Sequence, residues 1–307
     1  LPGSSLKGAL RTGLLAHAAL SGGLEEAEVN YRQGRDGNFV KEFAAENFER
    51  TLFRPLKNDP NHDLLRALHV FDSRPIPAIP SRLMLCLARV YTGGEPGSPV
   101  VVEAVQKDTV IEAEITIDEL ALQYAPKLGW EENSLILVHL IPMLQQVSRR
   151  RIRQELRMAR QKGFTATEAF YQQLDSLAQE TSGTSRAYLQ MGWGTGWNGM
   201  TIGPWLPKDT QDELRRNFQL GKPPGIKGQW EPTLSKPFPT SRRLRDLNEQ
   251  ADVPLGWVAV TFEPVGTPGE VWQALTHQAR EKGLPTLASP PPAEPTVPPA
   301  RPAAQAT

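Results

Sequence analysis

The sequence predicts an α+β protein on the strength of three patterns. Residues 5–20 carry leucines at helical spacing, and residues 141–162 have the amphipathic pattern of one long helix. Residues 100–105 and 110–117 are rich in valine and isoleucine and are separated by a short polar turn, a pattern that predicts a β-hairpin. Helices combined with antiparallel strand pairs are the components of a split β-α-β sheet.

The first predicted helix begins at a turn typical of a phosphate site. Ser4 or Ser5 is a suitable N-cap, and the N–H groups of a first helical turn attract anions. Lys7 and Arg11 are four residues apart, so they share one face of the helix. This pattern predicts a phosphate-binding helix start. An ordinary surface helix with two cations is the alternative on these residues alone.

The following stretch is predicted to contain one helix and two strands joined by loops. Residues 21–40 form a glycine-containing loop, and residues 41–53 are helical with three phenylalanines toward the core. Strand-like residues occur near 66–72 and 84–92. The prolines at 75–80 between them predict an extended loop, because proline fixes φ and lacks an N–H donor.

The long helix at 141–162 is predicted to carry a basic stripe. Arg149, Arg153, Arg157 and Arg160 fall within a sector of about 80° at the helical angle per residue. Such a stripe can follow a nucleic-acid backbone, pair with an acidic neighbouring subunit or face water. The residues alone leave these three alternatives open.

A glycine-rich segment follows a predicted strand at 186–191. Residues 194–199 fit the dinucleotide pattern G-x-G-x-x-G, but Gly203-Pro204 interrupts the helix that a nucleotide site needs. Glycines instead allow a backbone to approach a sugar-phosphate chain, and Trp193 and Trp197 have the ring area to stack on bases. The alternative is that both tryptophans belong to the core, which we favour slightly for the rings themselves.

Composition excludes a uniformly basic nucleic-acid-binding protein. The 307 residues contain 34 basic and 34 acidic side chains, so only local patches could attract RNA. No apolar run reaches the roughly 18 residues of a membrane span, and no secretory signal pattern is visible, so we expect a cytoplasmic protein without membrane contact.

Residues 268–282 predict a short helix, and the Pro/Ala-rich composition from residue 285 predicts a disordered tail.

The chemistry-bearing residues form no catalytic or metal pattern. The five histidines lack metal-ligand spacing, and the single cysteine has no partner for a disulfide. No P-loop, G-x-S-x-G or H-E-x-x-H sequence occurs. We therefore expect no catalytic residue, no metal site and no cofactor.

Four segments in order carry a resemblance to one family. They are Pro-Gly-Ser-Ser-Leu-Lys-Gly-Ala-Leu-Arg at 2–11, Asp-Pro-Asn-His-Asp-Leu-Leu to Val-Phe-Asp-Ser within 59–73, Met-Gly-Trp-Gly-Thr-Gly-Trp at 191–197, and Thr-Ser-Arg-Arg-Leu with Pro-Leu-Gly-Trp-Val within 240–258. Together they resemble the RAMP superfamily, the RRM-like RNA-binding subunits of type III CRISPR effector complexes. The resemblance is greatest to the family of fifth Csm subunits, which cap the guide-RNA 3′ end of type III-A complexes. Ser241 departs from the family, which more often has Thr-Arg directly.

The resemblance implies tandem RRM-like, ferredoxin-like RAMP domains. We expect an N-terminal domain at 1–118, a C-terminal domain with the glycine-rich loop at 119–263, and a short helix with a disordered tail at 264–307. Relatives have a segment before the Pro-Gly-Ser-Ser turn, so the first domain is expected to lack its N-terminal strand here.

The resemblance also implies a non-catalytic subunit that binds single-stranded crRNA. The implied partners are other Csm subunits, above all the repeated backbone RAMP subunit, together with target RNA and host nucleases that mature the guide. The residues predicted to bind RNA are Ser4, Ser5, Lys7, Arg11, Gly192, Trp193, Gly194, Thr195, Gly196, Trp197, Arg242 and Arg243.

Two alternatives stay open on the sequence. One is a RAMP endoribonuclease that cleaves precursor or target RNA, for which Asp72 is the nearest candidate for a catalytic aspartate. The other is a RAMP subunit of a different type III complex, such as a Cmr-like one.

Overall fold

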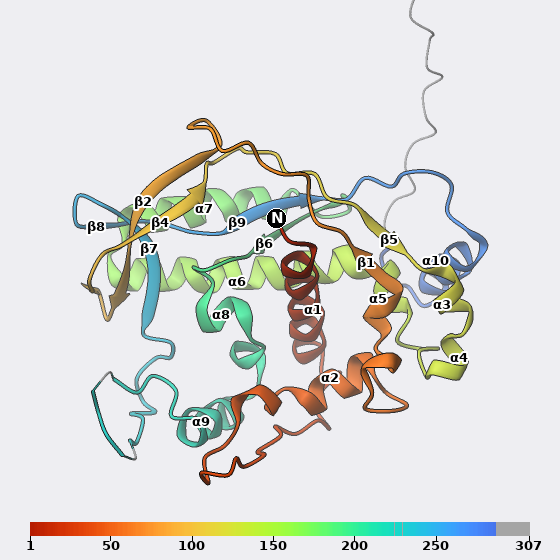
Figure 1. Ribbon diagram of the computed structural model, residues 1–307, viewed down its shortest axis with the longest axis horizontal. Helices are drawn as coiled ribbons and strands as arrows, with labels where there is room; N and C mark the ends of the chain where they lie inside the picture. Colours follow the sequence, from red (N-terminus) through yellow and green to blue (C-terminus); the bar gives the residue numbers. More distant parts are fainter. Residues whose placement is uncertain (224, 229, 287–307) are drawn as a thin grey trace, which may run out of the picture.

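The computed structural model describes residues 1–223, 225–228 and 230–286 and confirms the α+β organisation. Every strand pairing in this part of the chain is antiparallel. In Figure 1 two long helices, α6 and α7, run side by side, and α1 crosses α6 near its middle. One sheet lies at one end of these helices, while several short helices gather at the other end.

The elements have the following bounds. The helices are α1 (Gly3–Leu20), α2 (Glu46–Phe53), α3 (Glu119–Gln123), α4 (Ala125–Leu128), α5 (Leu135–Val138), α6 (Leu140–Lys162), α7 (Thr165–Gln179), α8 (Gly196–Met200), α9 (Lys208–Asn217) and α10 (Glu270–Glu281). The strands are β1 (Leu68–Val70), β2 (Leu83–Thr92), β3 (Glu95–Pro96), β4 (Val100–Val105), β5 (Ile115–Ile117), β6 (Arg186–Gln190), β7 (Ser241–Leu247), β8 (Gln250–Pro254) and β9 (Trp257–Thr261).

The helices predicted at 5–20 and 141–162 are confirmed as α1 and α6. Leu6, Leu10 and Leu14 are buried on one side of α1, as their spacing predicts. α6 buries its own apolar face, including Ile152, and is followed by Gly163, whose positive φ of 67° is typical of the residue that caps a helix C-terminus. These two helices form the frame on which the sheets and the smaller helices pack.

Among the described residues, three sheets are built around this frame. The largest has the order β3-β2-β7-β8, with β4 also paired to β2, and the other two are the pairs β1-β5 and β6-β9. The strands predicted near 66–72, 84–92 and 186–191 are therefore confirmed as β1, β2 and β6. The proline-rich stretch at 75–80 contains no helix or strand, as predicted.

The predicted hairpin between 100–105 and 110–117 is wrong. β4 pairs with β2 instead, Val105 lying opposite Leu83, while only residues 115–117 form a strand, and that strand pairs with β1. The turn that reverses the chain is Gly93-Gly94, where both residues have positive φ. Two such residues suit a tight hairpin turn, so β2 folds back on β3 and β4 before the 106–109 turn is reached.

The predicted helix at 41–53 is a 3-10 turn (Lys41–Phe43) followed by α2, and the helix predicted at 268–282 is α10. The tail predicted for 285–307 lies, from residue 287, outside the described residues. In the described part of the chain no helix is long and apolar enough to cross a membrane.

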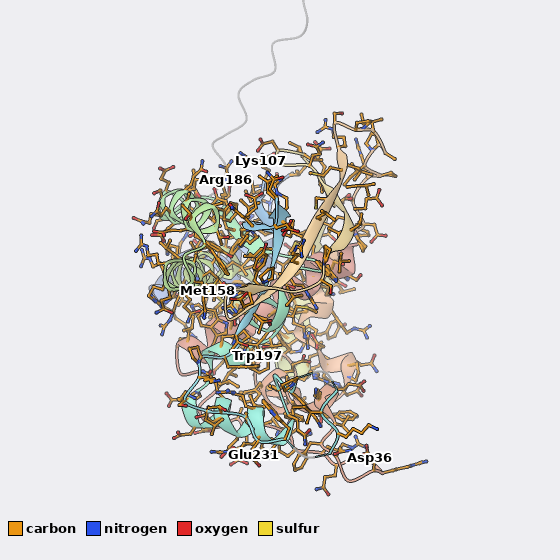
Figure 2. All side chains as sticks on the ribbon, turned by 90° about the vertical axis from the view of Figure 1, so that its left-hand side faces the viewer. Asp36, Lys107, Met158, Arg186, Trp197 and Glu231 are labelled. Atoms are coloured by element: carbon orange, nitrogen blue, oxygen red, sulfur yellow. The ribbon has the colours of Figure 1, made fainter. Side chains whose placement is uncertain are left out.

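Residues on both sides of the predicted domain boundary at 118 share one sheet and one core. β2 pairs with β7, and the largest core cluster joins Leu10 and Phe53 to Leu144 and Trp205. Seen from the side in Figure 2, α6 and α7 lie on one side of the molecule and the β2-β4 hairpin extends along the other. The three predicted domains and the tandem RRM-like arrangement stay predictions.

Candidate RNA interface

The start of α1 is capped by a carboxylate from another part of the chain. The N–H of Gly3 donates a hydrogen bond of 2.7 Å to Oδ1 of Asp72. Pro2 is the N-cap, and Ser4 and Ser5 lie inside the first turn with exposed side chains, so the prediction of a serine N-cap is wrong. An anion at this helix start would lie beside the Asp72 carboxylate, which already satisfies part of the positive end of the helix.

Arg11 is held by carboxylates within the protein. Its guanidinium donates to both oxygens of Asp63, over 3.1 and 2.7 Å, and to Glu49 over 2.8 Å, and it lies over the ring of Phe53. Burial acts to lower the pKa of Arg11, but the hydrogen bonds to Asp63 and Glu49 outweigh it, so the pKa is raised. Arg11 therefore ties α1 to α2 and to the segment before β1.

Lys7 is more available than Arg11. It is half-buried, and burial lowers its pKa, an effect that Asp63 opposes and that Arg11 and Arg66 reinforce. No hydrogen bond or ion pair of Lys7 occurs within the described residues. Lys7 is thus a cation with a free ammonium group beside other cations.

The glycine-rich segment forms a short loop between β6 and α8. Gly192 and Gly196 have positive φ, and Thr195 is buried with its hydroxyl donating to the carbonyl of Gly192 over 2.8 Å. The N–H of Met191 donates to the carbonyl of Gly256 over 2.8 Å, which anchors the loop to the turn between β8 and β9. Gly194 lies against Leu255 in the same region. The loop is therefore a fixed feature that presents backbone at the surface.

The two tryptophans of this segment have different surroundings. Trp193 is 46% exposed, and the guanidinium of Arg243 lies over its ring at 4.7 Å and donates to its carbonyl over 2.9 Å. Trp197 instead packs against the core and meets Phe238 edge to face at 5.3 Å. In Figure 2 Trp197 lies near the middle of the molecule. Of these two tryptophans, Trp193 is the one whose ring a base could reach, and the Arg243 guanidinium already lies against that ring.

A buried polar network joins the loop to α6. Glu155, 3% exposed, accepts a hydrogen bond from Asn198 over 2.5 Å and pairs with Arg242 over 2.7 Å. Arg242 also donates to the carbonyls of Pro239 and Ser241, so its guanidinium is used inside the protein. Of the predicted pair Arg242 and Arg243, Arg243 is the one that faces the surface.

The comparisons with known proteins give one similar structure. No protein-family model matches the chain, and no curated protein matches it. The chain is similar to a chain in the cryo-EM structure of a Csm–crRNA–target RNA ternary complex of a type III-A CRISPR-Cas system. The TM-score is 0.62 with 26% sequence identity over 85% of this chain and 72% of the other. This likeness is to a component of a Csm complex and does not distinguish among its subunits.

The basic stripe of α6 lies on the opposite side of that helix from Glu155 and the loop. Arg149, Arg153 and Arg157 line an open groove of about 480 Å³ together with Gln146, Arg150 and Leu20. Arg153 pairs with Asp175 over 3.2 Å and Arg160 with Glu168 over 2.9 Å, both acids being on α7. Part of the stripe is therefore neutralised by α7.

No catalytic group is evident at the loop. Asp72 is exposed and caps α1 through Gly3, which gives this candidate catalytic aspartate a structural role. Within the described ranges, no three His, Cys, Asp or Glu side chains gather where they could hold a metal ion. The absence of catalysis remains a prediction.

Glu155, Arg151 and Asn198 are polar residues of this region that sequence reasoning missed. Arg151 and Glu155 are four residues apart on α6 and are buried, at 8% and 3% exposed. The signal for them in the sequence is a charged pair on the apolar face of an amphipathic helix. Charged side chains are rarely buried unless they are paired, so such a pair predicts polar partners in the core. The arginines on the opposite face of α6 dominate the charge pattern of this helix, so the buried pair does not stand out in the sequence.

Proposed function

We propose that this chain is a non-catalytic RNA-binding subunit of a type III-A Csm ribonucleoprotein. The observation that carries the proposal is the likeness to a chain of a Csm–crRNA–target RNA complex over 85% of the sequence. The four family-like segments are spread over residues 2–258 of the chain. Within the complex, we assign the chain to the subunit that caps the crRNA 3′ end, on the resemblance to the fifth Csm subunits.

The proposed RNA contact is the surface around Trp193. One base stacks on the exposed face of Trp193, Arg243 supplies charge beside it, and the backbone from Gly192 to Gly196 approaches the sugar-phosphate chain. Lys7 supplies a separate cation for RNA on α1, beside Asp63 and Arg66. Arg242 holds this surface in place through Glu155, and Arg11 ties α1 to α2 through Asp63 and Glu49, so neither guanidinium is assigned to RNA.

The proposed partners are the crRNA, the repeated backbone RAMP subunit and other Csm subunits, with target RNA paired to the guide. The chain would support guide maturation by positioning the RNA 3′ end for nucleases that other proteins supply. The net charge of zero suits a subunit that contacts RNA along one narrow surface.

Binding of a guide-like single-stranded RNA to the full chain across a salt series tests this proposal. We expect affinity to fall as salt rises, and to fall further in Trp193→Ala, Arg243→Ala and Lys7→Ala, with the RNA left intact. The matched control is Arg157→Ala, on the far side of α6. Cleaved RNA would replace the proposal with the endoribonuclease alternative, and a folded chain that binds no RNA, alone or with its partner subunits, would overturn it.

A further inference from the structure

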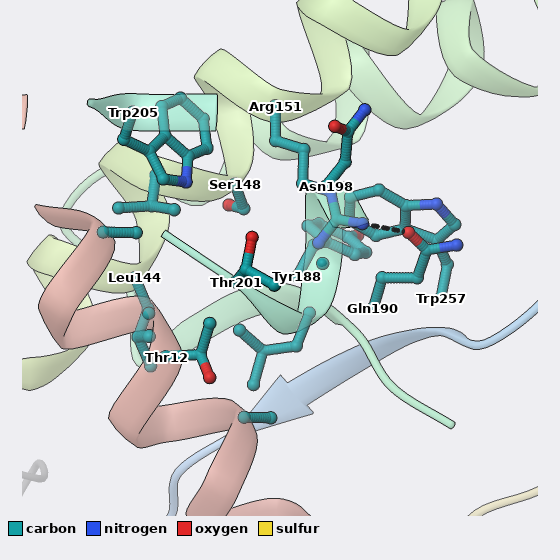
Figure 3. Close-up of a pocket in the computed structure, with 16 residues that line it drawn as sticks. Thr12, Leu144, Ser148, Arg151, Tyr188, Gln190, Asn198, Thr201, Trp205 and Trp257 are labelled. Carbon is teal, nitrogen blue, oxygen red and sulfur yellow. Dashed lines mark hydrogen bonds between the residues drawn. The ribbon is translucent and has the colours of Figure 1, made fainter. Parts of the chain in front are cut away.

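A small pocket opens beside α8, the helix that continues from the glycine-rich loop. Residues of α1, α6, β6 and α8 line it, and its volume is about 40 Å³. That is larger than the roughly 10–15 Å³ that a single water needs. Figure 3 shows its polar side chains, which include Thr12, Ser148, Arg151, Asn198 and Thr201.

Arg151 is the one charged side chain among the residues that line the pocket. It is 8% exposed, and its guanidinium donates to Oε1 of Gln190 over 2.5 Å, the contact drawn in Figure 3. Its Nε is buried and makes no hydrogen bond with any described residue. Gly199 makes room for it, because a Cβ there would come within 2.4 Å of the guanidinium. The pocket is thus lined by a cation that still has an N–H group available to donate a hydrogen bond.

The charged groups near Arg151 do not balance. Arg151 and Arg242 are cations, and Glu155, the carboxylate that acts on Arg151, already accepts hydrogen bonds from Asn198 and Arg242. No carboxylate oxygen lies within ion-pair distance of Arg151 in the described part of the chain. Burial lowers the pKa of Arg151, an effect that Glu155 only partly opposes. A buried cation without an anion is costly, so this site favours an anion from outside.

We propose that this pocket binds one phosphate group, with Arg151 as the residue that holds it. The planar guanidinium matches phosphate oxygens, and charge-assisted hydrogen bonds of this kind are strong when buried. Ser148 and Thr201 already donate their hydroxyl protons to Gln145 and Trp197, so Arg151 supplies most of the donors and Thr12 can add one. The phosphate belongs either to the RNA backbone, in which case the inference rests on the proposed function, or to a free phosphate.

Three variants separate phosphate binding from a purely structural role for Arg151. Arg151→Gln removes the charge, and Gln190→Glu places a carboxylate on the guanidinium and neutralises it without removing it. Arg150→Gln is the matched control, because Arg150 is exposed and lines the groove on the other side of α6. Because Gln190 also donates to the carbonyl of Leu255, the melting temperature of each ligand-free variant is measured first.

The first probe is inorganic phosphate at constant ionic strength. We expect it to raise the melting temperature of the wild-type chain and of Arg150→Gln but not of the other two variants. The second probe is guide-like single-stranded RNA. We expect its affinity to fall about tenfold or more in Arg151→Gln and Gln190→Glu, and the slope of log affinity against log salt to shrink by about 0.7, the value for one phosphate on a single strand.

The outcomes distinguish the sources and the two proposals. Arg151-dependent binding of inorganic phosphate without any RNA binding would keep the pocket as a free-phosphate site and reject the proposed function. If Arg151→Gln and Gln190→Glu both weaken RNA binding while inorganic phosphate does not bind the wild type, the phosphate belongs to the RNA backbone. If folded Gln190→Glu matches the wild type with both probes, or if the wild type responds to neither, the pocket holds water only. Gln190→Glu decides the matter even where Arg151→Gln fails to fold.

Discussion

Trp193 and Trp197 are four residues apart and have opposite surroundings, so their substitution separates RNA contact from folding. We expect Trp193→Ala to lower RNA affinity by roughly fivefold to a hundredfold, the value of one base stacked on an aromatic ring, with the unfolding free energy changed by less than about 0.5 kcal/mol. Trp197→Ala should instead reduce the unfolding free energy by on the order of 3 kcal/mol, because it removes a ring that packs on Phe238 and the core. Urea unfolding and RNA titration of both variants check this pair. Equal effects on stability would contradict it.

Tyr91 makes stability depend on alkaline pH. Burial, and then the 2.9 Å hydrogen bond to Asp246, raise the pKa of Tyr91 to about 12. An unfolded tyrosine titrates near 10, so between about pH 10 and pH 12 the native state keeps a proton that the unfolded state has lost, and the unfolding free energy falls as pH rises. Tyr91→Phe removes this contribution. Denaturation at about pH 8 and about pH 11 should show a smaller fall in the variant.

A residual fall is expected in Tyr91→Phe, because burial also raises the pKa of Tyr171. The variant should lose about 1 kcal/mol at neutral pH with the hydrogen bond to Asp246, which keeps its ion pair with Arg89. If the unfolding free energies of the wild type and Tyr91→Phe fell equally with rising pH, Tyr91 would not be the cause of the fall.

The residue types of the candidate site could be predicted from the sequence, but their partners could not. Arg11 is on the predicted face of α1, yet Glu49 and Asp63, 38 and 52 residues away, take up its guanidinium. Arg242 and Arg243 are adjacent, and strand alternation sends one to Glu155 and the other to Trp193. Those distinctions depend on long-range packing, which local patterns do not contain.

At the scale of elements, α6 holds the glycine-rich loop through Glu155. Glu155→Gln should lower the unfolding free energy by about 3 kcal/mol, because it removes the buried carboxylate that pairs with Arg242. Glu168→Gln is the matched control, since Glu168 also pairs with an arginine but at the surface, where such a pair contributes less than about 1 kcal/mol. Urea denaturation of both variants measures the difference. Similar costs would show that the buried network does not support the loop.

The elements themselves were predicted better than their pairing. The leucine spacing of α1 and the amphipathic pattern of α6 are local signals, and both helices lie where these signals indicate. Alternation identifies a strand without naming its partner, so 100–105 was matched to the wrong neighbour. The Gly93-Gly94 turn was the signal for the correct pairing, and α7 was not predicted at all.

At the scale of the whole molecule, the β2-β4 hairpin presents an apolar face that nothing in the described chain covers. Leu85 and Val101 are 73% and 64% exposed, and Leu87 and Val105 are also exposed. An exposed apolar patch promotes association. We expect Leu85→Ser with Val101→Ser to reduce concentration-dependent self-association of the isolated chain, measured by sedimentation velocity, with stability nearly unchanged.

Leu244→Ser on β7 is the control for that double variant. Leu244 belongs to the same sheet but is 2% exposed, so its substitution should destabilise the fold by on the order of 3 kcal/mol. A hairpin variant that is destabilised as strongly as Leu244→Ser would mean that the apolar face is already covered within the folded chain.

Placement of this chain at the 3′ end of a guide RNA is tested most directly by photo-crosslinking in a reconstituted complex. The full chain is assembled with the backbone RAMP subunit and a crRNA that carries a photoreactive base near either its 3′ or its 5′ end. We predict crosslinks from the 3′ base to the peptide that contains Trp193, and their loss in Trp193→Ala. Crosslinks to this chain from the 5′ base alone, or to neither, would contradict a capping role at the 3′ end.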